Sequence, residues 1–299
     1  MAYVYPGPKN NFLGDVGGYP YKGAYVYGAD AEFNCRGVGK STANTKCTFS
    51  GASANSYIGF SGQKTTTAKT NFDTIAKAYT DSGKDVWMVV DGTVGSKYIP
   101  SWVPLTAQEL TDLARAAADN ACNDTNVVGL AVDFEPYAKT FDTSVSGIFY
   151  TQLDQFIKNC NKKWAVFAGG SSWIQPNWDS LGTSGYLLLS AYDIGTTCPS
   201  AAVYQAELTN LLNVVVQNAI QYNKVDRIIP VFSGGGSTQL NDGCAPTTTM
   251  QQYATAAVLA VKNSKFAPYL KIGAIYPYRN GGLSPATPPP AVVQELMTL

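Results

Sequence analysis

Histidine is absent from all 299 residues of the sequence. This absence excludes Ser-His-Asp and Cys-His nucleophile systems, zinc sites with histidine ligands and histidine proton shuttles. Charged residues are also scarce, at 14% of the chain against roughly 25% in a typical soluble domain. Any acid-base chemistry therefore falls to carboxylates, tyrosine, lysine or cysteine, and the surface must be rich in neutral polar groups.

Several other features that define function classes are missing. Twenty-one basic residues balance twenty-one acidic ones, and no Lys/Arg cluster is long enough to follow a phosphate backbone, so nucleic acid is not expected as a partner. No apolar run is long enough to span a membrane. The sequence has no GxGxxG or GxxxxGK(S/T) turn and no CxxC pair, so neither a cofactor nor a metal site is expected.

What the sequence does contain is an even, scattered set of six cysteines. Such a set is typical of disulfides, and disulfides persist in oxidising compartments. The first residues, MAYVYPGPKN, lack the pattern of a signal peptide. We therefore expect a secreted, extracellular protein, either in its mature form or exported by another route.

Short apolar runs rich in Val, Ile, Tyr and Phe alternate with longer helix-patterned stretches from residue 23 onward. This alternation is typical of repeated βα units. The eight runs that we interpret as strands cover 23–30, 56–61, 84–91, 126–135, 163–169, 186–193, 226–233 and 271–278. The helices are expected at 67–82, 106–122, 145–161, 201–223, 247–263 and 289–298.

Strands of nearly continuous hydrophobicity, each buried on both faces, predict an α/β fold, the closed parallel (β/α)8 TIM barrel, in a single domain. We expect residues 1–22 to be an N-terminal extension and residues 23–299 to form the barrel, with some helices missing or replaced by loops. The segment 35–55, rich in Gly, Ser, Thr and Asn, is such a loop. An open doubly wound sheet is the rival, but it would normally carry a Gly-rich phosphate turn after its first strand.

A barrel also predicts how the cysteines pair. Cys122 and Cys160 each end a helix just before the next strand, and Cys198 and Cys244 each lie in a loop that follows one of two adjacent strands. Elements that follow adjacent strands are neighbours in a barrel. The predicted disulfides are therefore Cys35–Cys47, Cys122–Cys160 and Cys198–Cys244.

The apolar run VVGLAVDFEP, residues 127–136, ends in two carboxylates. Alternation along a strand puts Asp133 and Glu135 on one face, with their α-carbons about 7 Å apart. The carboxyl ends of barrel strands are where active sites form. A single acid there is explained equally well by a structural role, as a helix cap or in an ion pair with Lys139 or Arg279. Two acids on the same face of the strand favour catalytic carboxylates.

Other strand ends add acids and aromatic residues to the same predicted barrel mouth. Taken singly, each is as well explained by capping or by a structural hydrogen bond. Together they suit a sugar, because aromatic faces cover the apolar side of pyranose rings while carboxylates bind hydroxyls and donate protons. We therefore expect a carbohydrate partner. The predicted substrate-binding residues are Asp30, Asp91, Tyr276, Tyr278 and Arg279, and Tyr192 and Asp193 close the sixth strand.

The segment VGLAVDFE resembles the fourth-strand DxxDxDxE signature of family 18 glycoside hydrolases, and LSAYD at 189–193 resembles their sixth-strand MxYD. The resemblance implies that Glu135 is the general acid and that Asp133 orients the substrate's N-acetyl group, whose carbonyl oxygen is the nucleophile. Tyr192 and Asp193 would hold that group as it cyclises. This substrate-assisted scheme needs no second catalytic glutamate. The implied function is a secreted, cofactor-free hydrolase of N-acetylglucosamine-containing glycans.

The sequence also departs from the family pattern. Val128 and Ala131 stand where the pattern has its first two aspartates, and Tyr276 stands where a Trp is usual under the reacting sugar. Losing the middle aspartate removes a charge partner that helps to set the pKa values of Asp133 and Glu135.

Two alternatives therefore stay open. The first is a family 25-like lysozyme acting on peptidoglycan, since that group also combines a DxE at a barrel strand end with an aspartate on the first strand, here Asp30. The second is a barrel that has lost catalysis and works as a lectin, an inhibitor or a structural protein, because one fold hosts many functions. The intact set of Asp133, Glu135, Tyr192 and Asp193 favours an enzyme.

Overall fold

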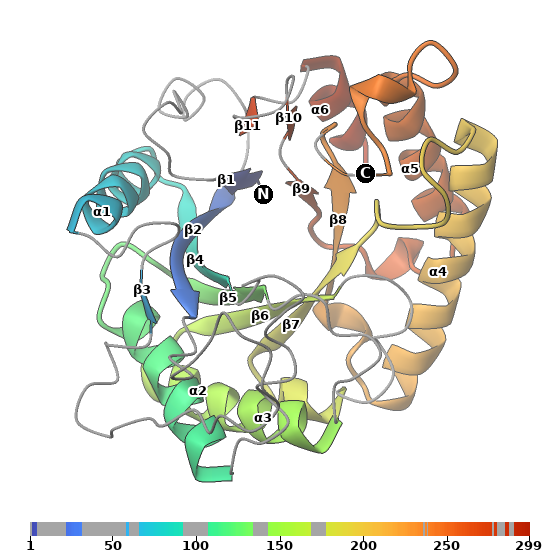
Figure 1. Ribbon diagram of the computed structural model, residues 1–299. Coiled ribbons are helices and arrows are strands. Elements are labelled where there is room, and N and C mark those ends of the chain that lie inside the picture. Colours follow the sequence, from blue (N-terminus) through green and yellow to red (C-terminus); the bar gives the residue numbers. More distant parts are fainter. Residues whose placement is uncertain are drawn as a thin grey trace, which may run out of the picture. The chain divides into compact units, whose positions relative to one another are not determined.

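Figure 1 shows the computed structural model of the chain. The chain forms two compact units. The N-terminal unit consists of Gly23–Tyr186 with Pro6–Pro8, and the C-terminal unit consists of Leu187–Leu299 with Met1–Tyr5 and Lys9–Lys22. The residues that the structure describes are 2–4, 22–31, 58–59, 66–91, 107–133, 143–168, 178–235, 237, 239–276, 278–279, 285–286 and 290–299.

The N-terminal unit is built on parallel strands in the order β2-β4-β5-β6, with β3 paired antiparallel to β2 at the edge. Helices α2 and α3 pack against each other, and α1 packs on β2 and β4. The elements are β2 (Gly23–Ala31), β3 (Ile58–Gly59), α1 (Thr66–Asp81), β4 (Asp85–Asp91), α2 (Ala107–Cys122), β5 (Gly129–Asp133), α3 (Thr143–Asn159), β6 (Lys163–Ala168) and a 3-10 helix at Asp179–Leu181.

The C-terminal unit has a second set of parallel strands in the order β7-β8-β9-β1. Helices α4 and α5 pack against each other, as Figure 1 shows, and α6 packs on α5. The elements are β1 (Ala2–Val4), β7 (Gly185–Ser190, of which Leu187 onward belongs here), α4 (Ala201–Gln221), β8 (Ile228–Ser233), α5 (Met250–Asn263), β9 (Ala274–Tyr276), the antiparallel ribbon of β10 (Tyr278–Arg279) and β11 (Pro285–Ala286), and α6 (Pro290–Leu296).

The predicted α/β architecture of parallel strands and helices is confirmed, and all six predicted helices are present within a few residues of their expected bounds. Local capping explains two of the starts. The Ser200 hydroxyl accepts from the Val203 amide at α4, and Thr249 forms a reciprocal capping box with Gln252 at α5. None of the helices in the described ranges has both the length and the apolarity that crossing a bilayer requires. The closed barrel, its single domain and the boundary at residue 22 stay predictions.

Three strands differ from the sequence-based expectation. The run 56–61 contains the two-residue strand β3, which pairs antiparallel to β2 rather than joining the parallel set. The run 271–278 divides, because the parallel strand β9 ends at Tyr276 and Tyr278 starts the separate ribbon β10. Residues 2–4, expected to lie in an extension, form β1 and pair in parallel with β9 through Ala2 and Ile275.

Two of the three predicted disulfides are confirmed. The Cα–Cα distances are 5.7 Å for Cys122–Cys160 and 5.1 Å for Cys198–Cys244. The first joins the end of α2 to the residue after α3, and the second joins the loops that follow β7 and β8. The third predicted pair, at positions 35 and 47, lies outside the described residues.

A buried carboxylate ties α3 to the segment that precedes β7. The Asp154 carboxylate on α3 accepts hydrogen bonds from the Trp164 indole at 2.9 Å and from the backbone amides of Thr183 and Ser184 at 3.3 and 3.1 Å. Gly182 lies against this carboxylate with a positive φ of 55°, where a Cβ would come within 2.1 Å of an Asp154 oxygen. Burial alone would raise the pKa of Asp154, but the hydrogen bond from the Ser184 hydroxyl and the bonds from the indole and the two amides outweigh it and lower the pKa.

We expect Asp154→Ala to lower the free energy of unfolding by about 3 kcal/mol at neutral pH, because buried donors lose their charged acceptor. A carboxyl group with a lowered pKa stabilises the fold above its ordinary pKa of about 3.9, and the stabilisation is lost as pH falls through the lower folded-state value. Urea unfolding at several pH values measures this. The exposed Asp81→Ala, which loses its Lys77 partner on α1, should change stability by less than about 0.5 kcal/mol. Equal effects of the two variants would contradict the assignment.

Candidate functional site

Three of the predicted site residues lie at or next to the carboxyl ends of adjacent parallel strands and are in register. Asp30 on β2 is the register partner of Asp91 on β4, and Asp91 is the register partner of Asp133 on β5. Neighbouring strands lie roughly 4.8 Å apart. The fold of the N-terminal unit therefore gathers three aspartates at the carboxyl end of one sheet.

The alignment of Asp30 depends on an irregularity in β2. Tyr27 pairs with Val89, but the next paired residue of β2 is Ala29, which pairs with Val90, so Gly28 is an extra residue between them. An extra residue of this kind shifts everything beyond it by one position. Without the shift, Ala29 instead of Asp30 would be the partner of Asp91.

Two apolar layers lie beneath the aspartates in the strand register. In the lower layer, Trp87 pairs with Tyr25 and Gly129, and the Trp87 ring lies 5.6 Å from the Tyr25 ring and 6.2 Å from that of Tyr186. A Cβ on Gly129 would come within 2.7 Å of the Trp87 ring, so glycine is what lets the indole lie against β5. Tyr25 and Trp87 are buried, so this layer of the unit is packed with aromatic rings.

The upper layer explains one departure from the family pattern. Ala131 pairs with Val89 and Ala165, and their side chains are 1%, 0% and 0% exposed, respectively. An aspartate at position 131 would be a carboxylate buried among aliphatic neighbours, which is strongly unfavourable without a partner. Asp133, two residues further along β5, has the acidic neighbour Asp91 instead.

Two more predicted residues follow β7 in the C-terminal unit, beyond the strand that ends at Ser190. Tyr192 is buried, at 7% exposure, and Asp193 is half-buried. The Asp193 amide donates to the Ser190 hydroxyl at 3.2 Å, and its carboxylate is hydrogen-bonded by the Gln239 side chain. Burial raises the pKa of Asp193, and the Gln239 bond partly opposes this rise.

For three of the remaining predicted residues the structure gives the backbone pairing. Tyr276 ends β9 in register with Ser233 of β8, while Tyr278 and Arg279 pair with Ala286 and Pro285 in the separate ribbon. Glu135 lies outside the described residues. Among the side chains that the structure describes, no group of three or more His, Cys, Asp or Glu is placed to hold a metal ion.

Sequence reasoning missed Gln239, which lies in the loop after β8. The only signal was its position, because loops that follow parallel strands carry the functional groups of such folds. The residue type gave no hint, since an amide is neither an acid nor an aromatic.

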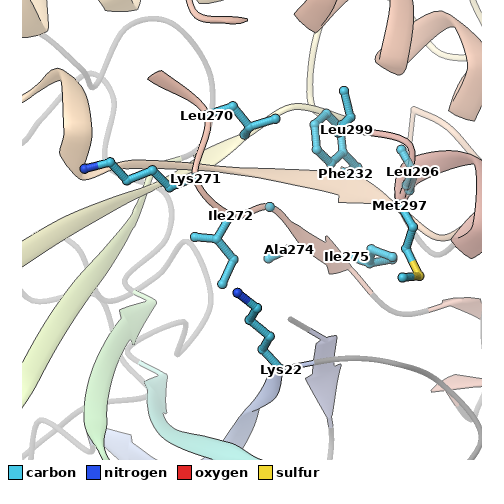
Figure 2. A pocket seen from close by; sticks show the side chains of 11 residues that line it. Lys22, Phe232, Leu270, Lys271, Ile272, Ala274, Ile275, Leu296, Met297 and Leu299 are labelled. Atoms are coloured by element: carbon cyan, nitrogen blue, oxygen red, sulfur yellow. The ribbon is translucent and has the colours of Figure 1, made fainter. Parts of the chain in front are cut away.

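The C-terminal unit also contains an apolar pocket of about 260 Å³ (Figure 2). Its walls come from the segment leading into β9, from Phe232 and from the C-terminal residues, and Lys22 reaches toward Ile272 from one side. The Lys271 amine points away and lies 3.6 Å from the Asp226 carboxylate. None of the predicted site residues lines this pocket, so we do not assign it to the candidate site.

Comparison with known proteins identifies the fold. No protein-family model matches the sequence, and no curated protein sequence does. Among solved structures, a chitinase of Chromobacterium violaceum ATCC 12472 is 12% identical with a TM-score of 0.61, over 99% of this chain and 98% of that one. The fold is chitinase-like.

Two further structures agree. A class V chitinase of Pseudomonas fluorescens Pf-5 is 8% identical with a TM-score of 0.61, over 100% of this chain and 98% of that one. A spore cortex-lytic enzyme of Bacillus megaterium QM B1551 is 9% identical with a TM-score of 0.59, over 99% of this chain and 72% of that one. The likeness is one of fold. It confirms a fold like that of family 18 glycoside hydrolases, the family whose motifs the sequence resembles.

We expect Asp193→Asn to keep or raise the melting temperature at pH 7. A carboxyl group with a raised pKa weakens the fold as pH rises through its folded-state value, so the neutral amide gains stability at neutral pH. This gain should vanish below the ordinary aspartate pKa of about 3.9, where both states of the wild type are protonated. Calorimetry from pH 3 to pH 8 measures it, with the exposed Asp179→Asn as control. A variant that melts well below the wild type at pH 7 would contradict the assignment.

Proposed function

We propose that this chain is a secreted glycoside hydrolase that cleaves N-acetylglucosamine-containing glycans by substrate-assisted general acid catalysis. The proposal includes a closed (β/α)8 barrel, in which the carboxyl ends of the strands form the glycan-binding mouth. The chitinase-like fold and the acids at the strand ends support it. Two disulfides support an oxidising, extracellular location.

In this mechanism, Glu135 gives its proton to the glycosidic oxygen while the substrate's acetamido oxygen attacks the anomeric carbon. The bond to the leaving sugar breaks, and a cyclic oxazolinium forms. A water molecule then loses a proton to the Glu135 carboxylate and opens the ring at the same carbon. Asp133 orients the acetamido group, and Tyr192 and Asp193 hold it. Because both displacements invert the anomeric carbon, the configuration is retained overall.

The observation that carries the proposal is the register of Asp30, Asp91 and Asp133 in a family 18-like fold. The family pattern places a carboxylate two residues before Asp133, where this chain has Ala131. Asp91 supplies a carboxylate from the adjacent strand instead. A neighbouring negative charge disfavours the ionised form of a carboxyl group. Asp91 would then take the part of the missing aspartate as the charge partner of Asp133.

We expect Asp91→Asn to lower kcat/KM about tenfold or more and to move the acidic limb of its pH profile to lower pH, because a neighbouring negative charge is lost. The melting temperature should not fall, since the change removes like-charge repulsion. Kinetics on a chitin oligosaccharide from pH 3 to pH 8, with calorimetry alongside, test this. An unchanged rate and pH profile would remove Asp91 from the mechanism.

Glu135→Gln should reduce cleavage of chitin oligosaccharides by at least about a hundredfold, because the amide cannot donate the catalytic proton. Mass spectrometry of the products measures this. Glu295→Gln on α6 is the matched control, since Glu295 contacts Gln251 at a helix surface, and it should cleave like the wild type. Full activity in Glu135→Gln would contradict the role of Glu135.

A second candidate function is cleavage of peptidoglycan by a lysozyme-like mechanism. The register that links Asp30 through Asp91 to Asp133 favours it, since that mechanism combines an aspartate on the first strand with a DxE motif, here Asp133 and Glu135. The likeness to the spore cortex-lytic enzyme points the same way. Assays of cleavage on peptidoglycan and on chitin oligosaccharides decide between the two activities, because each proposed function predicts cleavage of its own substrate. Glycan binding without cleavage of either substrate would indicate the lectin-like alternative.

A further inference from the structure

The loop between β8 and α5 is held in a fixed conformation around Gln239. The Cys198–Cys244 disulfide joins this loop to the one after β7, and the Cys198 amide donates to the Gln239 carbonyl at 2.9 Å. Next to it, the Ser237 hydroxyl donates to the Leu240 carbonyl at 2.9 Å and accepts from the Leu240 amide at 2.8 Å. The backbone on both sides of Gln239 is therefore anchored.

The loop after β7, which carries Asp193, is anchored as firmly. The Tyr204 hydroxyl on α4 donates to the Ala191 carbonyl at 2.6 Å, and the Tyr253 hydroxyl on α5 donates to the Pro199 carbonyl at 2.6 Å. The two tyrosine rings pack edge to face, with centroids 5.7 Å apart. Two anchored loops thus bring the side chains of Asp193 and Gln239 together.

The hydrogen bonding of this pair is incomplete when Asp193 is ionised. A carboxylate only accepts hydrogen bonds, so the Gln239 amide group must be the donor. The other amide atom, Gln239 Oε1, is buried and has no hydrogen-bond partner. A protonated carboxyl group can also donate to this oxygen, so the amide pairs with Asp193 in both protonation states. The bond to the ionised carboxylate is the stronger one because it is charge-assisted, and Gln239 therefore lowers the pKa of Asp193 from the value that burial alone would give.

Few other groups influence Asp193. Burial and the Gln239 bond act on its carboxyl group, and no charged side chain of the described residues is a further influence. Glu207 on α4 lies against Gly195, two residues after Asp193 in the same loop, but its charge is not among the causes of the Asp193 shift. A single neutral amide is therefore the polar partner through which the protein controls this carboxyl group.

We propose that Gln239 is a positioning residue for Asp193, holding its carboxyl group in one orientation in both protonation states and so setting the pH range in which the site binds the acetamido group. This inference rests on the proposed function for its catalytic consequence. Its structural part, the control of Asp193 by Gln239, is independent of any activity.

The test compares Gln239→Met with the wild type and with Gln217→Met, an exposed glutamine on α4. Carbon-13 NMR of aspartate-labelled full-length protein follows the titration of Asp193 directly. Because the Gln239 bond favours the carboxylate, its loss should move the Asp193 titration to higher pH. The acidic limb of the pH profile of kcat/KM on a chitin oligosaccharide should move to higher pH as well. At a fixed pH on the acidic side of that profile, kcat/KM should be about tenfold lower than in the wild type. Gln217→Met should change neither.

A second pair of variants keeps the inference testable if Gln239→Met does not fold. Gln239→Glu places two carboxyl groups together and should lower the melting temperature at pH 7. Adding Asp193→Asn restores an amide-carboxylate pair with the roles exchanged, so the melting temperature should recover while glycan cleavage stays lost. Such recovery is a direct measure of coupling between the two side chains.

The outcomes separate the two claims. If Asp193 titrates at the same pH in Gln239→Met as in the wild type, or if the double variant shows no recovery, the inference is wrong whatever the chain cleaves. If the titration shifts and the pH profile of kcat/KM does not, Gln239 has no role in the reaction and the inference is also overturned. If the wild type cleaves neither chitin oligosaccharides nor peptidoglycan, the proposed function fails, and the NMR titration still decides the pair.

Discussion

Parallel strand pairing fixes which residues stand side by side at the end of the sheet. In the N-terminal unit it puts Asp30, Asp91 and Asp133 into one row, and a single extra residue at Gly28 is what completes it. A shift of one residue in a strand turns every side chain beyond it to the other face. The alignment of these three aspartates therefore depends on the backbone hydrogen bonds between strands, including those on either side of Gly28.

The layers below the row show what keeps that register in place. Gly129 lets the Trp87 ring lie against β5, and the Val89, Ala131 and Ala165 layer is sealed from water. Small and aliphatic residues pack there at the expense of the carboxylate that the family pattern carries at position 131. In this chain the acidic neighbour of Asp133 is Asp91 on the adjacent strand. In the family pattern it is an aspartate two residues earlier on the same strand.

The sequence predicted much of this. Periodicity located the helices and most strands, because both patterns are local, and the alternation around Asp133 pointed to the carboxyl end of β5. It also identified two disulfides from their positions. The register shift in β2, the pairing of β1 with β9 and the antiparallel β3 were missed, because strand partners are set by long-range hydrogen bonds. Gln239 was missed because its importance comes only from its contact with Asp193.

The central claim is that a substrate acetamido group, oriented by strand-end carboxylates, acts as the nucleophile. Proton NMR of the anomer first released from a β-linked chitin oligosaccharide tests it most directly, with a glucose-only oligosaccharide of the same length as comparison. Substrate-assisted cleavage predicts the β-anomer as the initial product and no cleavage of the glucose oligosaccharide. Initial release of the α-anomer, or cleavage of both oligosaccharides at similar rates, would contradict the account.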